Sequence, residues 1–393
     1  MNRLRNSKIY LDYTSATPVL PEVRRAMEKY WSQDFYNPSA IYKEGLRVKE
    51  EIKECRARVA RALRVAPNGI IFTSGGTESD NLAILGLFEA SKKKLKQPHI
   101  IISAIEHPAV VAAAQEVVRR GGKMSILEVN EEGIVSVETL KDLVKKNTFL
   151  VSVGLANGEI GTIQPISKIG RFLSQFRKEH ASIYPYLHTD ASQTPSYLNV
   201  CLDSLNTDLL TLDGSKIYGP KGIGILAIRK GVKIHPIILG GGQEDGRRSG
   251  TLNLALVSGF VLSLEKVQQH REKELLRLEV LRQYFIQSVC KCLPQAIING
   301  APKNHLPNIV SVSVPGILSE FILLKLDQFG VMVSVGSACS LDGRVSGSPV
   351  ISALGKKDLA ESTLRFSFGR LTTLNEIKYA IKIFCLICNY VIK

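Results

Sequence analysis

Short apolar segments alternate with amphipathic segments through the first two-thirds of this sequence. The amphipathic segments, such as residues 109–120 and 166–180, repeat their apolar residues at helical spacing. Seven short runs between them are apolar and strand-like: residues 70–72, 99–103, 124–129, 149–153, 186–190, 209–212 and 224–228. Strands that alternate with helices favour a parallel sheet with helices on both faces. The pattern therefore predicts an α/β domain built on a mostly parallel, seven-stranded sheet.

The pattern changes near residue 252. A long helical segment extends from there to about residue 289, and short strand-like runs mix with helices beyond residue 297. A chain of 393 residues also exceeds one ordinary domain. We therefore expect a large α/β domain at residues 14–260. A smaller α+β domain would comprise residues 1–13 and 261–393.

The chain is basic, with a formal net charge of +15. Its Lys and Arg residues are dispersed along helical segments without interleaved aromatic residues, so direct nucleic-acid binding is not expected. An anionic cofactor and an acidic partner protein are both compatible with this charge. Because the sequence has neither an apolar run long enough for a membrane nor a secretory signal, we expect a cytoplasmic protein without membrane contact.

Seven cysteines are spread along the chain without a regular framework. An odd number in a protein expected in the cytoplasm predicts that structural disulfides are absent. The pairs Cys290/Cys292 and Cys385/Cys388 lie in apolar helical segments, and no second pair stands at zinc-binding spacing. We interpret them as buried small apolar residues and expect no metal site.

Polar residues follow several predicted strands at the point where each strand ends. Ligands of open α/β sheets bind beyond these carboxyl ends. The small residues of segment 73–79 open a helix whose free N–H groups suit a phosphate. His107 follows the next strand, and Asp190 ends a later one. Each feature alone has a plainer explanation, such as a helix cap or a turn.

Lys216 stands between two apolar runs, in the glycine-rich stretch 212–222. This position suits an amine that is desolvated, deprotonated and aimed at a carbonyl, although a turn-capping lysine is the plainer alternative. Combined with the anion cradle, the histidine and the buried-strand aspartate, Lys216 predicts a pyridoxal phosphate site. Nucleotides fit poorly, because the cradle lacks the P-loop lysine and no G-x-G-x-x-G opens a βαβ unit.

Cys339 follows an alternating strand at residues 331–335 and precedes a segment rich in Gly and Ser. A buried cysteine at a strand end is the plain interpretation. A thiol that begins a polar loop is instead exposed and able to act as a nucleophile or sulfur carrier. The sequence therefore makes Cys339 a candidate catalytic residue.

The sequence resembles the cysteine desulfurases, which are class V, fold-type I pyridoxal phosphate enzymes. The resemblance extends nearly from end to end, and its motifs occur in the family's order. They lie at residues 10–18, 37–39, 71–79, 106–107, 157–161, 190–193, 216–222, 240–244, 248–252, 336–339 and 364–367. This joint occurrence is far more specific than any single motif.

The resemblance implies a role for each candidate residue. Lys216 would hold the cofactor and move the Cα proton, Asp190 would pair with the pyridine nitrogen, and His107 would stack on the ring. The remaining cofactor ligands would be Gly76, Thr77, Asn157 and Gln193, with Thr251 contributed by the second subunit of a homodimer. Arg365, with Asn37, would bind the substrate carboxylate.

The family's reaction converts L-cysteine to L-alanine and leaves a persulfide on the protein. Cys339 would carry that sulfur to an acceptor protein, such as an iron–sulfur scaffold or a tRNA-thiolation factor. A related class V aminotransferase, a selenocysteine lyase and a non-catalytic scaffold subunit are the alternatives.

Three positions depart from the family pattern. Ser215 replaces a usual histidine, Asp213 replaces a usual phosphate-binding serine, and Gly158 replaces an asparagine. An aspartate beside a phosphate is repulsive unless it is turned away or paired. These substitutions are the reason to keep the scaffold alternative open.

Overall fold

A seven-stranded sheet forms the larger part of the molecule. The computed structural model describes residues 8–336 and 347–392. The strands lie in the order β2-β8-β7-β6-β5-β3-β4, and β8 alone runs antiparallel to its neighbours. Their bounds are β2 Ile70–Thr73, β3 His99–Ser103, β4 Lys123–Leu127, β5 Thr148–Ser152, β6 Tyr186–Asp190, β7 Leu209–Asp213 and β8 Gly224–Ile228. The predicted mostly parallel, seven-stranded α/β sheet is confirmed.

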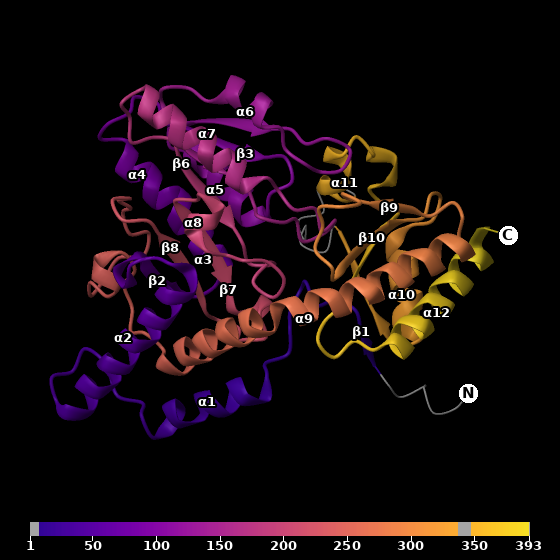
Figure 1. Cartoon of the computed structure of the whole chain (residues 1–393), viewed down its shortest axis with the longest axis horizontal. Coiled ribbons are helices and arrows are strands. Elements are labelled where there is room, and N and C mark those ends of the chain that lie inside the picture. Colours follow the sequence, from indigo (N-terminus) through magenta and orange to yellow (C-terminus); the bar gives the residue numbers. More distant parts are fainter. Residues whose placement is uncertain (1–7, 337–346, 393) are drawn as a thin grey trace.

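Helices cover both faces of this sheet (Figure 1). Successive residues of a strand face opposite sides, so Ile70 and Phe72 join one apolar cluster while Ile71 joins the other. The first cluster packs against α2 (Lys43–Leu63), α6 (Val137–Leu143), α7 (Ile166–Glu179) and the first part of α9 (Leu254–Cys292). The second packs against the π-helical turn η2 (Leu82–Gly86), α4 (Leu87–Ser91) and α5 (Pro108–Arg119), and the short helix α3 (Gly76–Asn81) directly precedes η2. The continuous apolar runs of the strands are explained by this double covering.

A second, smaller sheet lies beside the first. It is antiparallel in the order β12-β13-β10-β9, and a separate parallel pair joins β1 to β11. The strand bounds are β1 Ile9–Tyr10, β9 Ile297–Asn299, β10 Ile309–Ser313, β11 Val331–Met332, β12 Ser334–Val335 and β13 Thr363–Ser367. The remaining helices are α1 Pro21–Ser32, α8 Leu202–Leu205, α10 Ser319–Gln328, α11 Pro349–Ala353 and α12 Leu374–Ile392.

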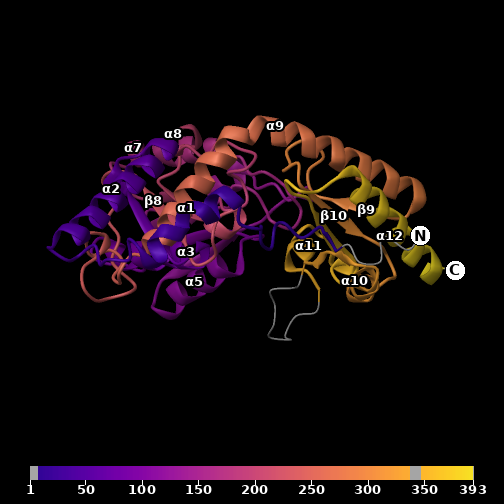
Figure 2. The same cartoon turned by 90° about the horizontal axis from the view of Figure 1, so that it is seen from below.

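The long helix α9 connects the two parts, as Figures 1 and 2 show. Asn253 caps its start by accepting a hydrogen bond from the Leu256 N–H. Val257 and Phe260 near this end pack into the core of the large sheet, whereas Phe285 near the other end packs into that of the small sheet. One rigid helix therefore fixes the spacing of the two sheets. The domain boundaries at residues 13/14 and 260/261 stay a prediction.

The expectation that no structural disulfide forms is wrong. The structure pairs Cys292, at the end of α9, with Cys385 of α12, with their Cα atoms 6.2 Å apart. That separation is within the normal range for a disulfide. The two residues are 93 positions apart, so their pairing depends on helix packing that cysteine spacing does not reveal. Cys55, Cys201 and Cys388 are buried, free thiols. Across residues 8–336 and 347–392, the helices are too short or too polar to cross a membrane.

Phe285 provides a test of the small core. Its side chain is fully buried and its ring centroid lies 4.7 Å from that of Phe366. We expect Phe285→Ala to lower the free energy of unfolding by about 3 to 5 kcal/mol, because it removes buried apolar surface and leaves a cavity. Urea-induced unfolding measures the change. The matched control, Leu276→Ala on the exposed face of the same helix, should stay within about 0.5 kcal/mol. Equal small losses in both variants would contradict this core assignment.

Candidate active site

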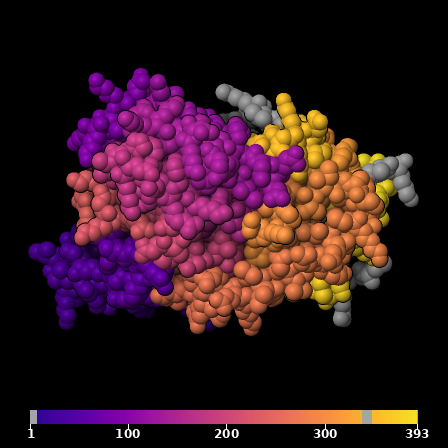
Figure 3. Space-filling model, turned by 45° about the horizontal axis from the view of Figure 1, so that its top comes forward, coloured from indigo at the N-terminus to yellow at the C-terminus, as the bar shows by residue number. Residues whose placement is uncertain are grey.

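A cavity of about 320 Å³ lies where the carboxyl ends of the large sheet face the small sheet. Figure 3 shows the outer surfaces of the two parts meeting along a seam, with indigo to magenta on one side and orange to yellow on the other. Strands β2, β3, β5, β6 and β7 run in one direction, so they end at the same edge. The small sheet contributes Val335 and Arg365 to the lining. Residues of both the large-sheet part and the small-sheet part of the molecule therefore line the cavity.

Most of the candidate residues meet in this cavity. Those that line it are Gly76, Thr77, His107, Asn157, Asp190, Gln193, Lys216 and Arg365. Asn37 and Thr251 are exposed in the single chain and are not among its lining residues. Cys339 lies outside the described residues. Residues from six separate parts of the sequence thus converge on one volume.

Lys216 is held by backbone oxygens at the mouth of the sheet. It ends a short 3-10 turn, Gly214–Lys216, that directly follows β7. Its Nζ donates hydrogen bonds to the carbonyl oxygens of Thr14, at 2.9 Å, and Ser15, at 2.6 Å. The N-terminal arm therefore fixes the position of the amine inside the cavity.

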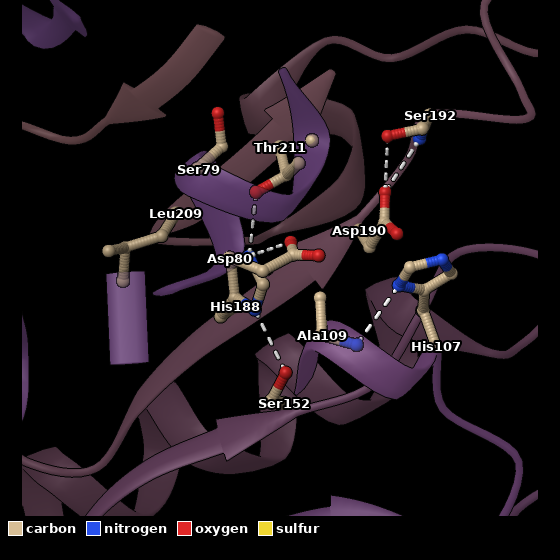
Figure 4. Close-up of polar contacts among 12 residues, drawn as sticks. Ser79, Asp80, His107, Ala109, Ser152, His188, Asp190, Ser192, Leu209 and Thr211 are labelled. Atoms are coloured by element: carbon tan, nitrogen blue, oxygen red, sulfur yellow. Dashed lines mark hydrogen bonds and ion pairs between the residues drawn. The ribbon is translucent and has the colours of Figure 1, made fainter. Parts of the chain in front are cut away.

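Asp190 ends β6 with its carboxylate held by a neighbouring residue. Its Oδ1 accepts hydrogen bonds from the Ser192 N–H, at 2.9 Å, and the Ser192 hydroxyl, at 2.6 Å. Figure 4 shows this carboxylate close to His107, which caps the start of α5. His107 Nδ1 accepts a hydrogen bond from the Ala109 N–H at 3.1 Å. Since Nδ1 is an acceptor, the neutral ring carries its proton on Nε2.

A buried polar network lies beneath Asp190 and was missed by the sequence analysis. His188 Nδ1 contacts the Ser152 hydroxyl at 2.8 Å, and its Nε2 contacts the Thr211 hydroxyl at 3.0 Å (Figure 4). Asp80 Oδ1 lies 3.6 Å from the same Nε2 and has no hydrogen-bond partner among the described residues. The sequence did contain a signal for this network: His188 and Asp190 are polar and two positions apart in a predicted strand. Alternate residues of a strand lie on the same face of the sheet.

Burial sets the charge of this network. It lowers the pKa of His188 to about 3, so the imidazole is neutral at physiological pH. Burial also raises the pKa of Asp80 well above its usual value, and the charge of Asp190 adds to this rise. The same burial therefore disfavours the charged forms of both His188 and Asp80 beneath Asp190.

Glu106 is a further acidic residue that the sequence analysis did not assign. Its Oε1 accepts hydrogen bonds from the Ser103 hydroxyl and, at 2.9 Å, from the Gly154 N–H. Burial raises the pKa of Glu106 to about 7, against the opposing effect of these hydrogen bonds. The carboxyl group therefore titrates close to neutral pH inside the cavity.

Arg365 extends from β13 into the cavity. One of its terminal nitrogens donates to Asp12 Oδ1 and to the Ser15 hydroxyl, each at 2.8 Å, and the other donates to the Gly158 oxygen at 3.1 Å. Its buried Nε has no hydrogen-bond partner among the described residues. A guanidinium oriented in this way suits a planar anion such as a carboxylate. Asp12, which fixes it, was not predicted as a site residue.

Asn157 and Gln193 hold the loops around the cavity. The Asn157 amide donates to the Ile105 oxygen and accepts from two N–H groups of the turn that follows it. Gln193 Nε2 donates to the Thr14 oxygen at 3.0 Å. A Cβ on Gly158 would lie 3.4 Å from Gln193 Nε2, so the side chain absent at Gly158 leaves Gln193 room. The Asn157 amide is thus already engaged by backbone groups.

The predicted phosphate cradle contains a carboxylate. Asp213 Oδ2 accepts a hydrogen bond from the Gly76 N–H at 2.8 Å. Asp213 Oδ1 accepts from the Ser215 N–H, at 2.7 Å, and the Ser215 hydroxyl, at 2.6 Å. The substitutions at Asp213 and Ser215 are therefore linked to each other by hydrogen bonds.

The donor set of the cavity fits a pyridoxal cofactor. It combines an amine at Lys216, an anionic carboxylate at Asp190 and an imidazole at His107, within a volume large enough for a small heterocycle. The guanidinium of Arg365 adds a binding site for the carboxylate of a ligand. The phosphate end of the cavity differs, because the Gly76 N–H is already engaged by Asp213.

Comparisons with known proteins agree with this geometry. Residues 9–380 match the family model described as aminotransferase class-V. The chain is similar to a protein of Dictyoglomus turgidum named cysteine desulfurase IscS, with 42% identity over 96% of this chain and 93% of the relative. Among solved structures, it is similar to a NifS-like protein with a TM-score of 0.89 and 31% identity, covering 98% of this chain and 100% of the other. It is also similar to SspA in complex with cysteine, with a TM-score of 0.77 and 32% identity, covering 92% and 99% of the two chains.

Glu106 provides a pH-dependent test of the site. Its pKa rises from 4.5 to about 7 in the folded protein, so between these values the folded state binds more protons than the unfolded state. The free energy of unfolding contributed by Glu106 therefore falls as the pH rises through this window. Across this pH window, we expect the free energy of unfolding to fall by about 1 to 3 kcal/mol less in Glu106→Gln than in wild type.

Urea-induced unfolding at a series of pH values across the window measures this difference. Glu272→Gln, at an exposed position, is the control and should keep the wild-type slope. The assignment is wrong if Glu106→Gln and wild type lose stability in parallel.

Proposed function

This chain belongs to the class-V aminotransferase family, among the cysteine desulfurases, and we propose that it transfers the sulfur of L-cysteine to its own Cys339. The observation that carries the proposal is the convergence of Lys216, Asp190, His107 and Arg365 on one cavity. An amine, an anion, an imidazole and a guanidinium are the groups needed to hold a pyridoxal cofactor and an amino-acid carboxylate.

Pyridoxal phosphate is the proposed cofactor, and when bound it would supply an electron sink for the carbon atoms of the substrate. Lys216 would hold its aldehyde carbon, and Asp190 would pair with its ring nitrogen. Ser192 keeps the Asp190 carboxylate in place through two hydrogen bonds. His107 would cover the ring, while Gln193, Gly76 and Thr77 would complete the binding site.

The substrate carboxylate would bind Arg365. Asp12 and Ser15 hold one guanidinium nitrogen, and the Gly158 oxygen holds the other, so the group is oriented before substrate arrives. Preorganisation of this kind lowers the entropy lost on binding. The amino group of the substrate then lies toward Lys216, whose Nζ would accept and return the Cα proton.

Sulfur transfer would occur at Cys339. Its thiolate attacks Sγ of the substrate, the Cβ–Sγ bond breaks and an S–S bond forms. L-Cysteine and the protein thiol thus become L-alanine and a protein persulfide, with no external oxidant. Gly336 lines the cavity, and three residues of chain reach at most about 10 Å beyond it. This chain length would allow Cys339 to reach the substrate.

A homodimer is the proposed assembly. The exposed Thr251 would enter the cavity of the partner, and the exposed Asn37 would complete the substrate site. Large apolar side chains are exposed on α1, α2 and the segment between them: Trp31, Phe35, Ile41, Tyr42 and Leu46. Such exposure supports burial against another protein surface. A sulfur acceptor for iron–sulfur assembly or tRNA thiolation, and a cytoplasmic location, remain part of the proposal.

Alanine release tests the proposed reaction. With L-cysteine, reductant and added pyridoxal phosphate, we expect wild type to release alanine and Cys339→Ser to release less than about 1% of that amount, because the nucleophile is lost. Equal release from both would favour a lyase or an aminotransferase. Release from neither would favour the non-catalytic subunit. Retained release from selenocysteine alone by Cys339→Ser would show that the remaining site is intact.

Arg365 tests the substrate carboxylate site. A lysine keeps the charge but cannot form the planar, two-pronged contact. We expect Arg365→Lys to raise the KM for L-cysteine about 10- to 100-fold. A change of this size corresponds to the binding free energy of one charge-assisted hydrogen bond. Steady-state kinetics at saturating cofactor measure the change, with Arg119→Lys on the exposed face of α5 as the control. An unchanged KM would place the carboxylate elsewhere.

A further inference from the structure

The Asp213 carboxylate lies on the backbone donor that a cofactor phosphate would use. The Gly76 N–H is the first one of α3, and it donates to Asp213 Oδ2 at 2.8 Å. A Cβ placed on Gly76 would lie 3.3 Å from both Asp213 Oδ2 and the Ser192 hydroxyl. The space around this N–H is therefore narrow. One N–H aimed at one oxygen cannot serve a carboxylate and a phosphate equally well.

The two oxygens of Asp213 are held unequally. Oδ1 accepts two hydrogen bonds, from the N–H and the hydroxyl of Ser215. Oδ2 accepts only the one from Gly76 among the described residues. Ser215 can therefore keep the carboxylate anchored through Oδ1 while Oδ2 leaves Gly76.

The Asp213 carboxyl group opposes a phosphate at this end of the cavity. Five acidic residues line the cavity, namely Asp80, Glu106, Glu159, Asp190 and Asp213, but burial raises the pKa values of Asp80, Glu106 and Glu159 and so favours their neutral forms. The three donors that bind Asp213 are neutral. Because a phosphate ester carries about −1.5 to −2 charges near neutral pH, its approach to an ionised Asp213 is unfavourable.

We propose that Asp213 competes with the cofactor phosphate for the Gly76 N–H and thereby limits the affinity for pyridoxal phosphate. This inference rests on the proposed function for the identity of the cofactor. Binding requires Asp213 Oδ2 to leave Gly76, and Ser215 retains the displaced carboxylate. Asp213 is a specificity-determining residue, because it disfavours the phosphorylated form of the cofactor relative to the form that lacks phosphate.

Binding of two ligands to the full-length, cofactor-depleted protein tests the proposal. Pyridoxal phosphate and pyridoxal share the ring and the aldehyde and differ in the phosphate. Titrations followed by visible absorbance give both dissociation constants. We expect Asp213→Asn to lower the Kd for pyridoxal phosphate at least about 10-fold, equivalent to about 1.4 kcal/mol, and to change the Kd for pyridoxal less than about twofold.

Two more variants separate local charge from other effects. Asp213→Ser replaces the carboxylate with a hydroxyl group and should also tighten the binding of pyridoxal phosphate selectively. This second variant keeps the test valid if the asparagine variant fails to fold. Asp203→Asn removes one exposed charge at a distant ion pair with Arg229 and should change neither Kd. This control excludes an effect of net charge alone.

The outcomes distinguish this inference from the proposed function. Unchanged affinity for pyridoxal phosphate, or an equal shift for both ligands, overturns the competition. Failure of both ligands to bind wild type and both Asp213 variants overturns the competition together with the proposed cofactor. Selective tightening in a protein that releases no alanine supports the competition and contradicts only the desulfurase reaction.

Discussion

The common direction of the strands in the large sheet is the constraint on which the site depends. Parallel strands end at one edge, and the backbone N–H and side-chain groups that follow them are brought together without any local sequence relationship. Gly76, His107, Asp190 and Lys216 come from four such strand ends. The helix α9 then sets the distance to the small sheet, so that Arg365 reaches the same cavity.

The site is an acidic cavity in a basic protein. The net charge of +15 is distributed over exposed helices, whereas carboxyl groups predominate along the cavity lining. Burial favours the neutral forms of two of these groups, since it raises the pKa values of Asp80 and Glu106. The Asp190 carboxylate, held by Ser192, lies at the cavity beside these buried groups. The net charge of the chain therefore says little about the electrostatics of its binding site.

The strand-end rule predicted Lys216, Asp190 and His107 from sequence, because a strand's end is visible in the local pattern of apolar residues. The same local pattern could not reveal pairings between distant residues. Asp213 meets Gly76 across 137 positions, Arg365 meets Asp12 across 353, and Cys292 meets Cys385 across 93. Each pairing depends on how whole elements pack. The expectation of no disulfide was wrong for this reason.

The sequence by itself determined the α/β sheet, the family and the chemical groups of the site. Apolar periodicity and strand-end residues are local properties of the chain, and they are sufficient for those conclusions. The tertiary structure decided which polar groups are desolvated, which hydrogen bonds they form and which are already occupied. These properties depend on distances between segments far apart in the chain. The engagement of the Gly76 N–H by Asp213 is one example, since it exists only after β2 and β7, which flank β8, end at the same edge of the sheet.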